Sequence, residues 1–395
     1  MRIVHVIDYF QPKLGYQETF LAREQARLGH EVYVVTSDRY NPIVYSGGAA
    51  KSIMGSRKVG DGFFIEEGIK VWRLRTLSEL LHGIWVVGLE EKIQELEPDV
   101  VVMHGIASLA AIRMARLKRR TGGFKLIYDD HMTYDNSRSP MKMLYPVFKC
   151  LFSGLIQQTA DALVAILPET RTFMNKKYGI SLDRIILIPL GADDELFRFD
   201  AAARQEMRNR LNINESDIVF IYTGKVVPSK RLPLLIEAIS LLGNHDDVKV
   251  LIVGNGSRSY LSRLQQEIQT RDLEGKFIWH GAVPNQELYK IYSAADVAVW
   301  PSGASISQRE AMACSLPIII GEGSKVTELI GYTNGLICRE EDATDLAQQM
   351  EKLFDSELRS EMGRNSRRFV EERLSWKIIA RKFIELVSSG SKERK

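Results

Sequence analysis

The feature that most constrains the fold of this chain is a regular alternation between two kinds of segment. Short runs rich in β-branched residues, at 2–7 and 31–37, are separated by an amphipathic segment at 18–28. Strands that alternate with helices of this length indicate a parallel sheet covered by helices on both faces. The series continues with a strand, a helix and a strand at 100–104, 107–120 and 125–128. The first half is therefore predicted to be an α/β domain.

The same alternation starts again after a polar stretch near residues 199–216. Its predicted strands are 218–223, 249–253, 276–280, 296–300 and 316–320, and its predicted helix is 231–242. At 395 residues the chain is too long for one ordinary core and suits two domains. We therefore expect Rossmann-like domains at 1–195 and 196–374, and a helix within 375–395 that packs back on the N-terminal domain.

Composition excludes several classes of protein. The net charge of +3 is small for this length, so nothing indicates a nucleic-acid partner. Cys150, Cys314 and Cys338 lie far apart and have no zinc-type spacing, which favours reduced thiols in a cytosolic protein. The N-terminal MRIVHVIDYF lacks the apolar core of a secretory signal, and no apolar run approaches the roughly 20 residues of a membrane span. A cytoplasmic, soluble chain is expected.

Two loops at predicted strand ends contain residues suited to binding an anion. In DYFQPKLGYQE, Gly15 either lets a phosphate approach the amides of the next helix or is an ordinary turn glycine. In YTGKVVPSKRLPLLIEA, Gly224 ends a strand, and Lys225 and Lys230 lie on either side of a turn. A cation at a helix N-terminus opposes the helix dipole, so an anionic ligand would offset its cost. A solvated lysine pair is the alternative, but the position at the ligand-binding edge of a sheet favours the anion site.

A third loop resembles half of a dinucleotide fingerprint. Gly254 and Gly256 follow a strand in VLIVGNGSRSYL, but Ser259 occupies the position of the third glycine. No acidic residue follows at the end of the next strand, where a dinucleotide ribose would need one. The sequence therefore argues against nicotinamide binding.

The loop in VWPSGASISQREAMACSLPIII separates two apolar runs and contains one carboxylate. Ser307 and Glu310 fit a capping box, which by itself would explain both residues. Alternatively, Ser305, Ile306 and Ser307 present backbone amides at a helix start, and Glu310 accepts two hydrogen bonds from a vicinal diol such as ribose. The loop alone is compatible with both roles.

Taken together, these segments resemble family 4 of the retaining glycosyltransferases, whose GT-B fold has two Rossmann-like domains facing across a cleft. In the first domain the similar segments are LGHEVYVVTS, DVVVMHG, LIYDDHM and IPLGADDELF. In the second they are FIWHGAVPNQELYKIYSAADVAVWPS, EAMACSLPII and TELIGYTNGLI. The resemblance implies an acceptor on the N-terminal domain and a nucleotide-sugar donor on the C-terminal domain.

The resemblance also implies roles for individual residues. The family's basic pair on the donor diphosphate corresponds to Lys225 and Lys230, and its ribose-binding glutamate to Glu310. Its histidine beside the transferred sugar corresponds best to His131, with His104 as a weaker candidate that also fits a hydrogen-bonded histidine at a strand end. The donor loops would then include Gly224, Gly254, Gly256 and Ser305 to Ser307.

Three departures from the family pattern concern the donor site. Lysine stands at Lys225 where the family usually has arginine, so the charge is kept without the bidentate fork. Gly15-Tyr16 replaces a common glycine pair, which narrows the expected amide cradle. Ser302 stands where many members carry an earlier glutamate that contacts the donor sugar, so sugar recognition is expected to differ.

The resemblance implies transfer with retention of anomeric configuration. His131, Lys225 and Lys230 are the expected catalytic residues, since fixed cations stabilise a leaving diphosphate. The second domain has no DxD-type acidic pair, so no metal and no cofactor are expected beyond the nucleotide-sugar co-substrate, with uridine diphosphate as first choice and guanosine diphosphate as second. Two alternatives stay open: a nucleotide-sugar epimerase of the same fold, and a non-catalytic donor-binding subunit.

The acceptor is expected to be a saccharide or a lipid-linked saccharide in envelope-polysaccharide or glycoconjugate synthesis. The pattern behind the lipid alternative is a set of basic residues near the aromatic MLYPVFKCLF. These residues are Arg113, Arg116, Lys118, Arg119, Arg120, Arg138, Lys142 and Lys149. Such a surface either rests on anionic lipid at the inner face of the cytoplasmic membrane or is an ordinary solvated helix beside a core helix.

Overall fold

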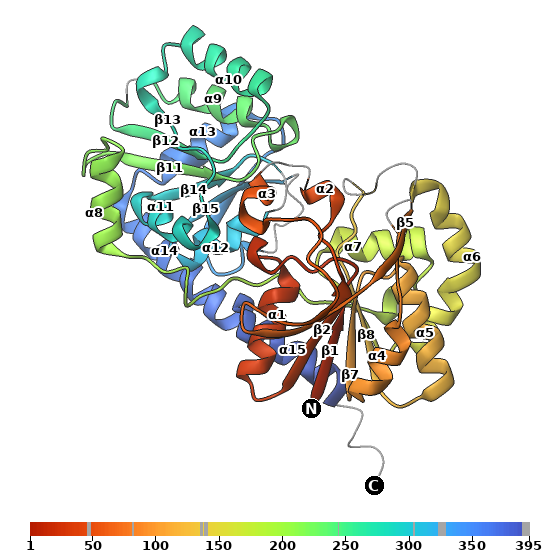
Figure 1. Cartoon of the computed structure of the whole chain (residues 1–395). Helices are drawn as coiled ribbons and strands as arrows, with labels where there is room; N and C mark the ends of the chain where they lie inside the picture. The colour runs from red at the N-terminus through yellow and green to blue at the C-terminus, as the bar shows by residue number, and fades with distance from the viewer. Residues whose placement is uncertain are drawn as a thin grey trace. The chain divides into compact units, whose positions relative to one another are not determined.

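The computed structural model describes residues 1–45, 49–80, 83–134, 137, 141–243, 245–302, 305–322 and 329–388. It divides into two compact units, each with its own parallel sheet (Figure 1). Unit 1 consists of Met1–Leu190 and Trp376–Lys395, and unit 2 of Gly191–Ser375. The chain thus enters unit 2 after residue 190 and returns to unit 1 at residue 376.

Unit 1 is built on an eight-stranded sheet with the order β10-β9-β8-β7-β1-β2-β4-β3. Its strands are β1 (Arg2–Val6), β2 (Glu31–Ser37), β3 (Gly62–Glu66), β4 (Ile69–Leu74), β7 (Val100–His104), β8 (Lys125–Asp130), β9 (Ala162–Ala165) and β10 (Ile185–Leu187). All neighbours pair in parallel except β3, which is antiparallel to β4 at one edge. The order of strands reverses direction between β1 and β7. Ligands of such sheets bind outside the carboxyl ends of the strands at this switch point.

Helices pack against the sheet of unit 1. They are α1 (Gln17–Arg27), α2 (Pro42–Tyr45), α3 (Ala49–Met54), α4 (Leu89–Leu96), α5 (Leu109–Thr121), α6 (Met141–Thr159), α7 (Pro168–Phe173) and α15 (Trp376–Ser388). The central strands β7 and β8 are almost entirely buried, and the apolar face of α5 packs into the same core. The alternation in the sequence predicted β1, β2, β7 and β8 because buried parallel strands are continuous apolar runs.

The edge of unit 1 contains strands that the sequence analysis did not predict. β3 carries Phe63 and Ile65 on its exposed face, and β5 (Thr76–Leu80) and β6 (Gly83–Val86) form a separate antiparallel pair. An edge strand has one solvated face, so its pattern is mixed rather than continuously apolar. A search for the continuous apolar runs of buried parallel strands therefore does not find these strands.

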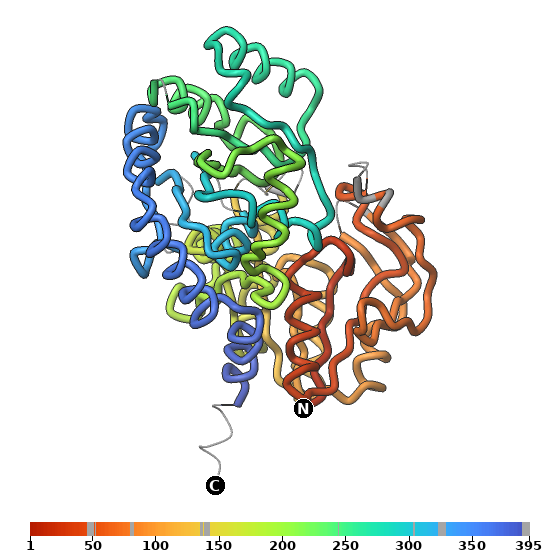
Figure 2. Tube along the Cα trace, turned by 90° about the vertical axis from the view of Figure 1, so that its left-hand side faces the viewer, coloured from red at the N-terminus to blue at the C-terminus, as the bar shows by residue number. Residues whose placement is uncertain are grey.

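The prediction that the C-terminal helix returns to the first domain is confirmed. α15 lies beside α1 in both views (Figures 1 and 2), where the blue helix neighbours the red one. The rings of Phe20 on α1 and Trp376 on α15 stack with centroids 5.3 Å apart. Both side chains are buried, so the contact removes apolar surface from water.

Unit 2 repeats the same sheet topology with six parallel strands in the order β13-β12-β11-β14-β15-β16. The strands are β11 (Ile218–Thr223), β12 (Val248–Val253), β13 (Phe277–Trp279), β14 (Val297–Trp300), β15 (Ile318–Gly321) and β16 (Gly335–Cys338). The helices are α8 (Ala201–Arg210), α9 (Leu232–Leu241), α10 (Arg258–Thr270), α11 (Leu288–Ala294), α12 (Ser307–Ala313), α13 (Ala343–Lys352) and α14 (Ser356–Phe369). The switch point of this sheet lies between β11 and β14.

Within the described ranges, none of the helices has both the length and the hydropathy to cross a bilayer.

Candidate functional site

A cavity of about 560 Å³ lies at the switch point of the sheet in unit 1. It is lined by Ile7, Asp8, Glu18, Asn41, Ile43, Val44, His104, Gly105, Ile106, Ala107, Ser108, Asp130, His131, Met132, Tyr145 and Tyr178. These residues come from the carboxyl ends of β1, β7 and β8, from the start of α1, α2 and α6, and, for Tyr178, from the helical turn Met174–Tyr178 after α7. Parallel strands bring these ends to one edge, which is why residues 8, 104 and 131 meet there.

His131 is one of the lining residues, and its charge state is set by Asp129. The ring Nε2 lies 3.1 Å from Asp129 Oδ2, and 38% of the side chain is exposed. Burial disfavours the imidazolium, but the Asp129 carboxylate outweighs this effect and raises the pKa of His131 to about 9. Asp129 itself is fully buried and its pKa is lowered by both histidines, although burial alone would raise it. A positively charged His131 therefore faces the cavity at neutral pH.

The second histidine candidate, His104, belongs to a buried hydrogen-bonded chain. Its Nδ1 lies 3.1 Å from Asp129 Oδ2, and its Nε2 lies 3.0 Å from Nδ1 of His5. His5 in turn contacts Gln25 Oε1 at 2.7 Å, and burial together with the charge of His104 lowers the pKa of His5 to about 3. Both ring nitrogens of His104 are thus engaged, which agrees with the interpretation of a satisfied histidine at a strand end. Its position orients Asp129 for His131.

Asp130 has a structural role beside this chain. Its two carboxylate oxygens accept hydrogen bonds from the backbone N–H groups of Ile106 (3.0 Å) and Met132 (2.7 Å). The loops that follow β7 and β8 are thereby tied to each other. Burial nevertheless raises the pKa of Asp130.

The sequence analysis missed two carboxylates of the cavity, Asp8 and Glu18. Asp8 follows β1 directly, and burial raises its pKa to about 7. Glu18 lies in the first turn of α1 and is only 6% exposed. Their signal in the sequence was weak, because an acid after a strand and an acid at a helix start are both common. Only the pairing of β1 with β7 brings them to the same cavity as His131.

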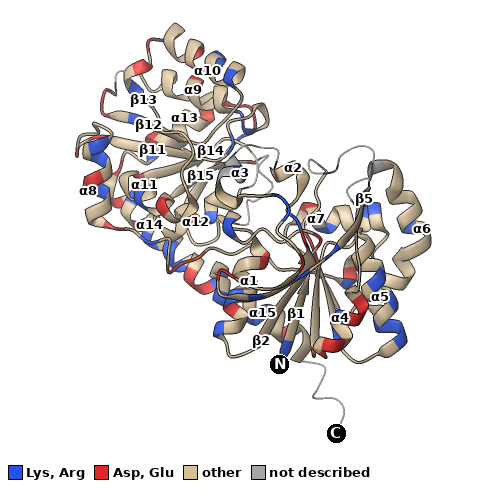
Figure 3. Cartoon of the chain, viewed as in Figure 1, with Lys and Arg blue, Asp and Glu red and all other residues tan. Residues whose placement is uncertain are grey.

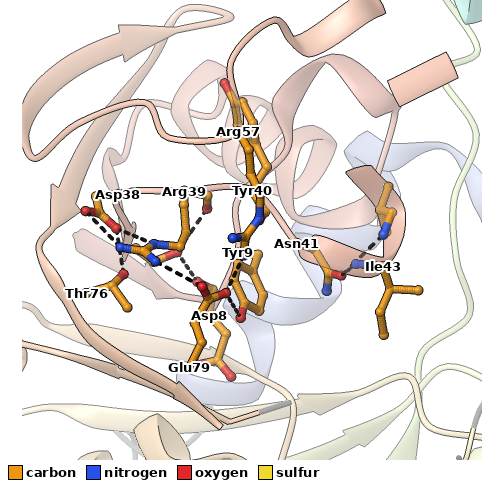
Figure 4. Close-up of polar contacts among 12 residues, drawn as sticks. Asp8, Tyr9, Asp38, Arg39, Tyr40, Asn41, Ile43, Arg57, Thr76 and Glu79 are labelled. Carbon is orange, nitrogen blue, oxygen red and sulfur yellow. Dashed lines mark hydrogen bonds and ion pairs between the residues drawn. The ribbon is translucent and has the colours of Figure 1, made fainter. Parts of the chain in front are cut away.

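A polar network holds the neighbouring edge of unit 1 in place (Figure 4). Arg39 bonds Asp38 at 2.8 Å and Glu79 at 2.9 Å, and Tyr9 also donates to Glu79 at 2.8 Å. Arg57 completes the arrangement with a further ion pair to Glu79. The network joins the end of β2 to β5, and it lies next to Asn41 and α2, which form one wall of the cavity.

One group of three side chains in the described part of the chain has ligand atoms close enough for a metal ion. His104, Asp129 and His131 place one such atom each within 4.8 Å of the others. Gln17 Nε2 also donates to the shared Asp129 oxygen at 2.9 Å. The same atoms therefore either form the hydrogen-bonded chain described above or hold a small divalent cation.

Gly15 and Tyr16 lie at the start of α1. Gly15 has φ +70° and ends a short helical turn, a conformation that favours glycine. Tyr16 is the N-cap residue of α1, and its side chain makes no capping hydrogen bond. The N-terminus of α1 thus has backbone amides that no side chain of the cap residue covers.

In unit 2, the two predicted lysines follow β11. Lys225 is exposed, and Lys230 is partly buried in a short helical turn, Pro228–Lys230, that precedes α9. The N-cap residue of α9 is Arg231, one position later than the analysis expected, and it pairs with Glu341. The prediction that Lys230 stands at the helix start is therefore wrong by one residue, because the proline-led turn fits in front of the helix.

Side chains from two other segments connect the end of β11 to the start of α12. Tyr292 on α11 shares a hydrogen bond of 2.8 Å with Thr223 and donates to the carbonyl of Ser307 at 3.2 Å. Trp300 Nε1 donates to the carbonyl of Thr223 at 2.9 Å. Gly224 at the end of β11 and Glu310 in the first turn of α12 are far apart in the sequence and are thus held near each other at the switch point.

The capping arrangement of α12 differs from the predicted Ser307–Glu310 box. The N–H of Ser305 donates to Gln308 Oε1 at 3.0 Å, and the N–H of Ser307 donates to Ser305 Oγ at 3.3 Å. Ser307 is the first helical residue, preceded by Ile306 as the N-cap residue. The capping hydrogen bonds therefore form two residues earlier than predicted. Two of the three amides expected to face a phosphate already donate within the loop; Ile306 N–H has no acceptor among the described residues.

Glu310 is consequently not used as a cap. It is 4% exposed, and Asn285 Nδ2 donates to its Oε1 at 2.9 Å. Burial raises the pKa of Glu310 to about 7, and the donors from Asn285 and Tyr292 only partly oppose this shift. A buried carboxylate with so few donors is suited to accept further hydrogen bonds.

Gly254 and Gly256 have a structural explanation that requires no ligand. A Cβ on Gly254, whose φ is +150°, would lie 1.8 Å from the carbonyl oxygen of Gly224. A Cβ on Gly256 would lie 2.3 Å from the carbonyl oxygen of Val226. The missing side chains allow the loops after β11 and β12 to approach backbone to backbone, which also fixes Gly224.

Two family models match the chain. "Glycosyltransferase Family 4" matches residues 19–196, and "Glycosyl transferases group 1" matches residues 203–369. The chain is 25% identical over 320 residues to the D-inositol 3-phosphate glycosyltransferase of Xylanimonas cellulosilytica, covering 78% of this chain and 71% of that protein. It is 27% identical over 320 residues to the GDP-mannose-dependent monoacylated alpha-(1-6)-phosphatidylinositol monomannoside mannosyltransferase of Corynebacterium glutamicum, covering 76% and 79%.

Solved structures agree with the fold. Anabaena HepE in complex with UDP superposes with a TM-score of 0.75 at 17% identity, covering 98% of this chain and all of HepE. A glycosyltransferase from Rickettsia africae superposes with a TM-score of 0.74, also at 17% identity, and covers 99% of both chains. The protein therefore has the GT-B class of fold. The two family models match successive parts of the chain and together cover most of it. The chain belongs to glycosyltransferase family 4, as the motifs predicted.

Proposed function

We propose that the chain is a retaining glycosyltransferase that moves a sugar from a nucleoside diphosphate sugar to a hydroxyl of a saccharide or lipid-linked saccharide. Family membership supports sugar transfer. One observation carries the donor half of the proposal: Lys225, Lys230 and Glu310 lie at the switch point of the sheet in unit 2, where α/β sheets bind ligands.

Each side chain at the donor edge has a role in this proposal. Lys225 and Lys230 neutralise the diphosphate and stabilise it as the leaving group. Glu310 accepts hydrogen bonds from the two ribose hydroxyls, and the Ile306 amide together with the Gly224 loop contacts the phosphates. In unit 1, the protonated ring of His131 is assigned to donate a hydrogen bond to the sugar that is transferred. Two lysines in place of a metal make the reaction metal-independent.

Uridine diphosphate sugars are the first donors to test, and guanosine diphosphate sugars the second. The HepE crystal contains UDP, whereas the Corynebacterium relative is named for its dependence on GDP-mannose. A panel of both kinds is incubated with the protein and mixed saccharide acceptors, and free nucleoside diphosphate is measured. We expect that nucleoside diphosphate is released only when acceptor is present, and that the release persists in EDTA. NMR of the product should show an unchanged anomeric configuration.

The same assay separates the alternatives. An epimeric nucleotide sugar formed without acceptor identifies an epimerase, and tight donor binding without turnover identifies a donor-binding subunit. Loss of activity in EDTA that Mn²⁺ or Zn²⁺ restores would contradict metal independence and direct attention to His104, Asp129 and His131.

We further propose that α6 of unit 1 rests on a membrane during acceptor binding. The expected aromatic surface is wrong in detail: Tyr145 and Phe148 are buried. At helical spacing they pack into a cluster with Phe173 and Tyr178. The exposed face of α6 is instead aliphatic, and it is formed by Met143 (76% exposed), Leu144, Val147 and Leu151.

The charges near α6 fit the proposal in part. Basic residues are frequent along α5 (Figure 3). Arg113 and Lys118 form ion pairs with Glu90 and Asp161, whereas Arg116, Arg119 and Arg120 are exposed. Lys149 on α6 is also exposed. Arg138 lies outside the described residues, as does the side chain of Lys142.

Flotation with vesicles that contain anionic phospholipid tests this contact. The Met143→Glu, Leu151→Glu double variant is expected to lose binding, since both changes put a charge on the apolar face. Leu77→Glu, at an equally exposed leucine on β5, is the matched control. Equal flotation of all three proteins would contradict the proposal.

A further inference from the structure

The charges that line the cavity of unit 1 do not suit a phosphate group. Among its described lining residues there is no lysine and no arginine, while three carboxylates, Asp8, Glu18 and Asp130, line it. His131 is the lining side chain whose raised pKa favours a positive charge, and the carboxylate of Asp129 already balances that charge. A phosphate monoester carries nearly two negative charges and would meet no further cation here.

Two of the three carboxylates have hydrogen-bonding capacity that the protein does not use. Asp130 spends both oxygens on backbone N–H groups. The Asp8 carboxyl has no hydrogen-bond partner in the described structure; only its backbone carbonyl is bonded, to Thr36 and Ser37. Glu18 is more than nine-tenths buried, and its carboxylate has only its own backbone N–H as a partner. The Asp8 carboxyl is half-buried and the Glu18 carboxylate is buried, and both have acceptor positions that the hydroxyl groups of a ligand can fill.

The remaining walls of the cavity suit the carbon face of a sugar. Ile43, Val44, Ile106 and Met132 provide apolar surface, and Tyr145 and Tyr178 add aromatic surface. A pyranose ring needs both kinds of group, acceptors such as Asp8 and Glu18 for its hydroxyls and apolar surface for its C–H groups.

We propose that this cavity binds the acceptor as a neutral polyol, a sugar unit without phosphate, whose hydroxyl groups donate to Asp8 and Glu18. This inference rests on the function proposed above and narrows its acceptor class. A lipid-linked acceptor fits only if its diphosphate lies outside the cavity.

Saturation-transfer NMR tests the proposal without any donor. The probes are methyl glucoside, methyl mannoside, methyl galactoside and myo-inositol, compared with glucose 6-phosphate, mannose 6-phosphate, galactose 6-phosphate and inositol 1-phosphate. At least one neutral probe is expected to bind, and its phosphate ester at least tenfold more weakly. Stronger binding of the phosphate esters, or no binding of any neutral probe, would overturn the proposal.

Isosteric variants locate the interaction. At pH 8, above the pKa of Asp8, Glu18→Gln and Asp8→Asn are each expected to weaken binding of the neutral probe by about tenfold, since a neutral amide oxygen accepts a weaker hydrogen bond than a carboxylate. If the occupant were anionic, the same variants would strengthen binding by removing repulsion. Glu95→Gln, on exposed α4, is the control that leaves binding unchanged, and thermal unfolding shows that each variant is folded.

The two proposals fail separately. Absence of sugar transfer with every donor would overturn the proposed function while the NMR result stands. Transfer to phosphorylated sugars only would uphold the proposed function and overturn this one.

Discussion

The switch points of the two sheets have the same topology and different chemistry. In unit 1 the strand ends carry Asp8, His104, Asp129 and His131, and the cavity at these strand ends has no lysine or arginine among its described lining residues. In unit 2 the corresponding strand ends carry two lysines and one buried glutamate, Glu310. In the two proposals above, the same topology carries the groups assigned to sugar hydroxyls in one unit and the groups assigned to phosphate in the other. The backbone determines where ligands bind, and the side chains determine which.

The two edges are also stabilised in different ways. In unit 1 a side chain, Asp130, ties two loops together through backbone N–H groups. In unit 2 the backbones themselves meet, because Gly254 and Gly256 have no Cβ atoms. The first arrangement depends on two acceptor oxygens of one carboxylate, and the second depends on the absence of two Cβ atoms. The following tests are designed to break this contrast.

The largest effect is expected at the cationic edge. Lys230→Ala should lower kcat/KM by on the order of tenfold to a thousandfold, because a fixed positive charge on the leaving diphosphate is lost. Lys352→Ala, on exposed α13 of the same unit, is the control and should have no effect. A turnover within about twofold of wild type in Lys230→Ala would remove the charge contrast between the edges.

The structural contrast is tested by Gly254→Ala. A methyl group 1.8 Å from the Gly224 carbonyl oxygen, at a φ that disfavours side chains, should lower the free energy of unfolding of unit 2 by about 2–5 kcal/mol. At Gly275 an added Cβ would have no neighbouring atom within 4 Å, so Gly275→Ala should change the free energy of unfolding by less than about 1 kcal/mol. Chemical denaturation measures both, and equal stability of the two variants would show that the loops can separate freely.

Glu310→Gln tests the carboxylate at the cationic edge. The donor KM should rise by about tenfold, because hydrogen bonds from ribose to a charged acceptor weaken. The pKa of Glu310, about 7, places its ionisation in the working range, so the wild-type donor KM should fall as pH rises from 6 to 8. The raised pKa favours the protonated form in the fold, so its stability contribution is lost as pH rises from about 4.5 to 7. A pH profile unchanged by Glu310→Gln would contradict both roles.

The smallest effect concerns the histidine edge. In Asp129→Asn the pKa of His131 should fall from about 9 towards its ordinary value of 6.5, since the neighbouring carboxylate is gone. The raised pKa contributes stability that is complete below about 6.5 and is lost as pH rises through 9, so the variant should lack this alkaline loss. NMR titration of the imidazole and urea unfolding at pH 6 and 9 measure the two quantities. An unshifted His131 titration would show that Asp129 serves only His104.

Much of the fold followed from the sequence because burial leaves a direct pattern. Parallel strands covered on both faces are continuous apolar runs, so β2, β7 and β11 agree with the predicted bounds to the residue. Edge strands such as β3 have one solvated face and were missed for that reason. Residue types at strand ends likewise indicated the lysine positions, since position in a strand–helix unit is local information, whereas the two histidines were assigned through the resemblance to the family.

Tertiary structure decided what those residues meet. Asp8, Glu18 and His131 share a cavity only because β1 pairs with β7 and β7 with β8, which no local pattern states. The cap of α12 formed through Ser305 and Gln308, and this left Glu310 without a capping role. The partners of these hydrogen bonds depend on which segments the fold brings together. The alternation of strands and helices depends on the spacing of apolar residues, which the sequence states directly.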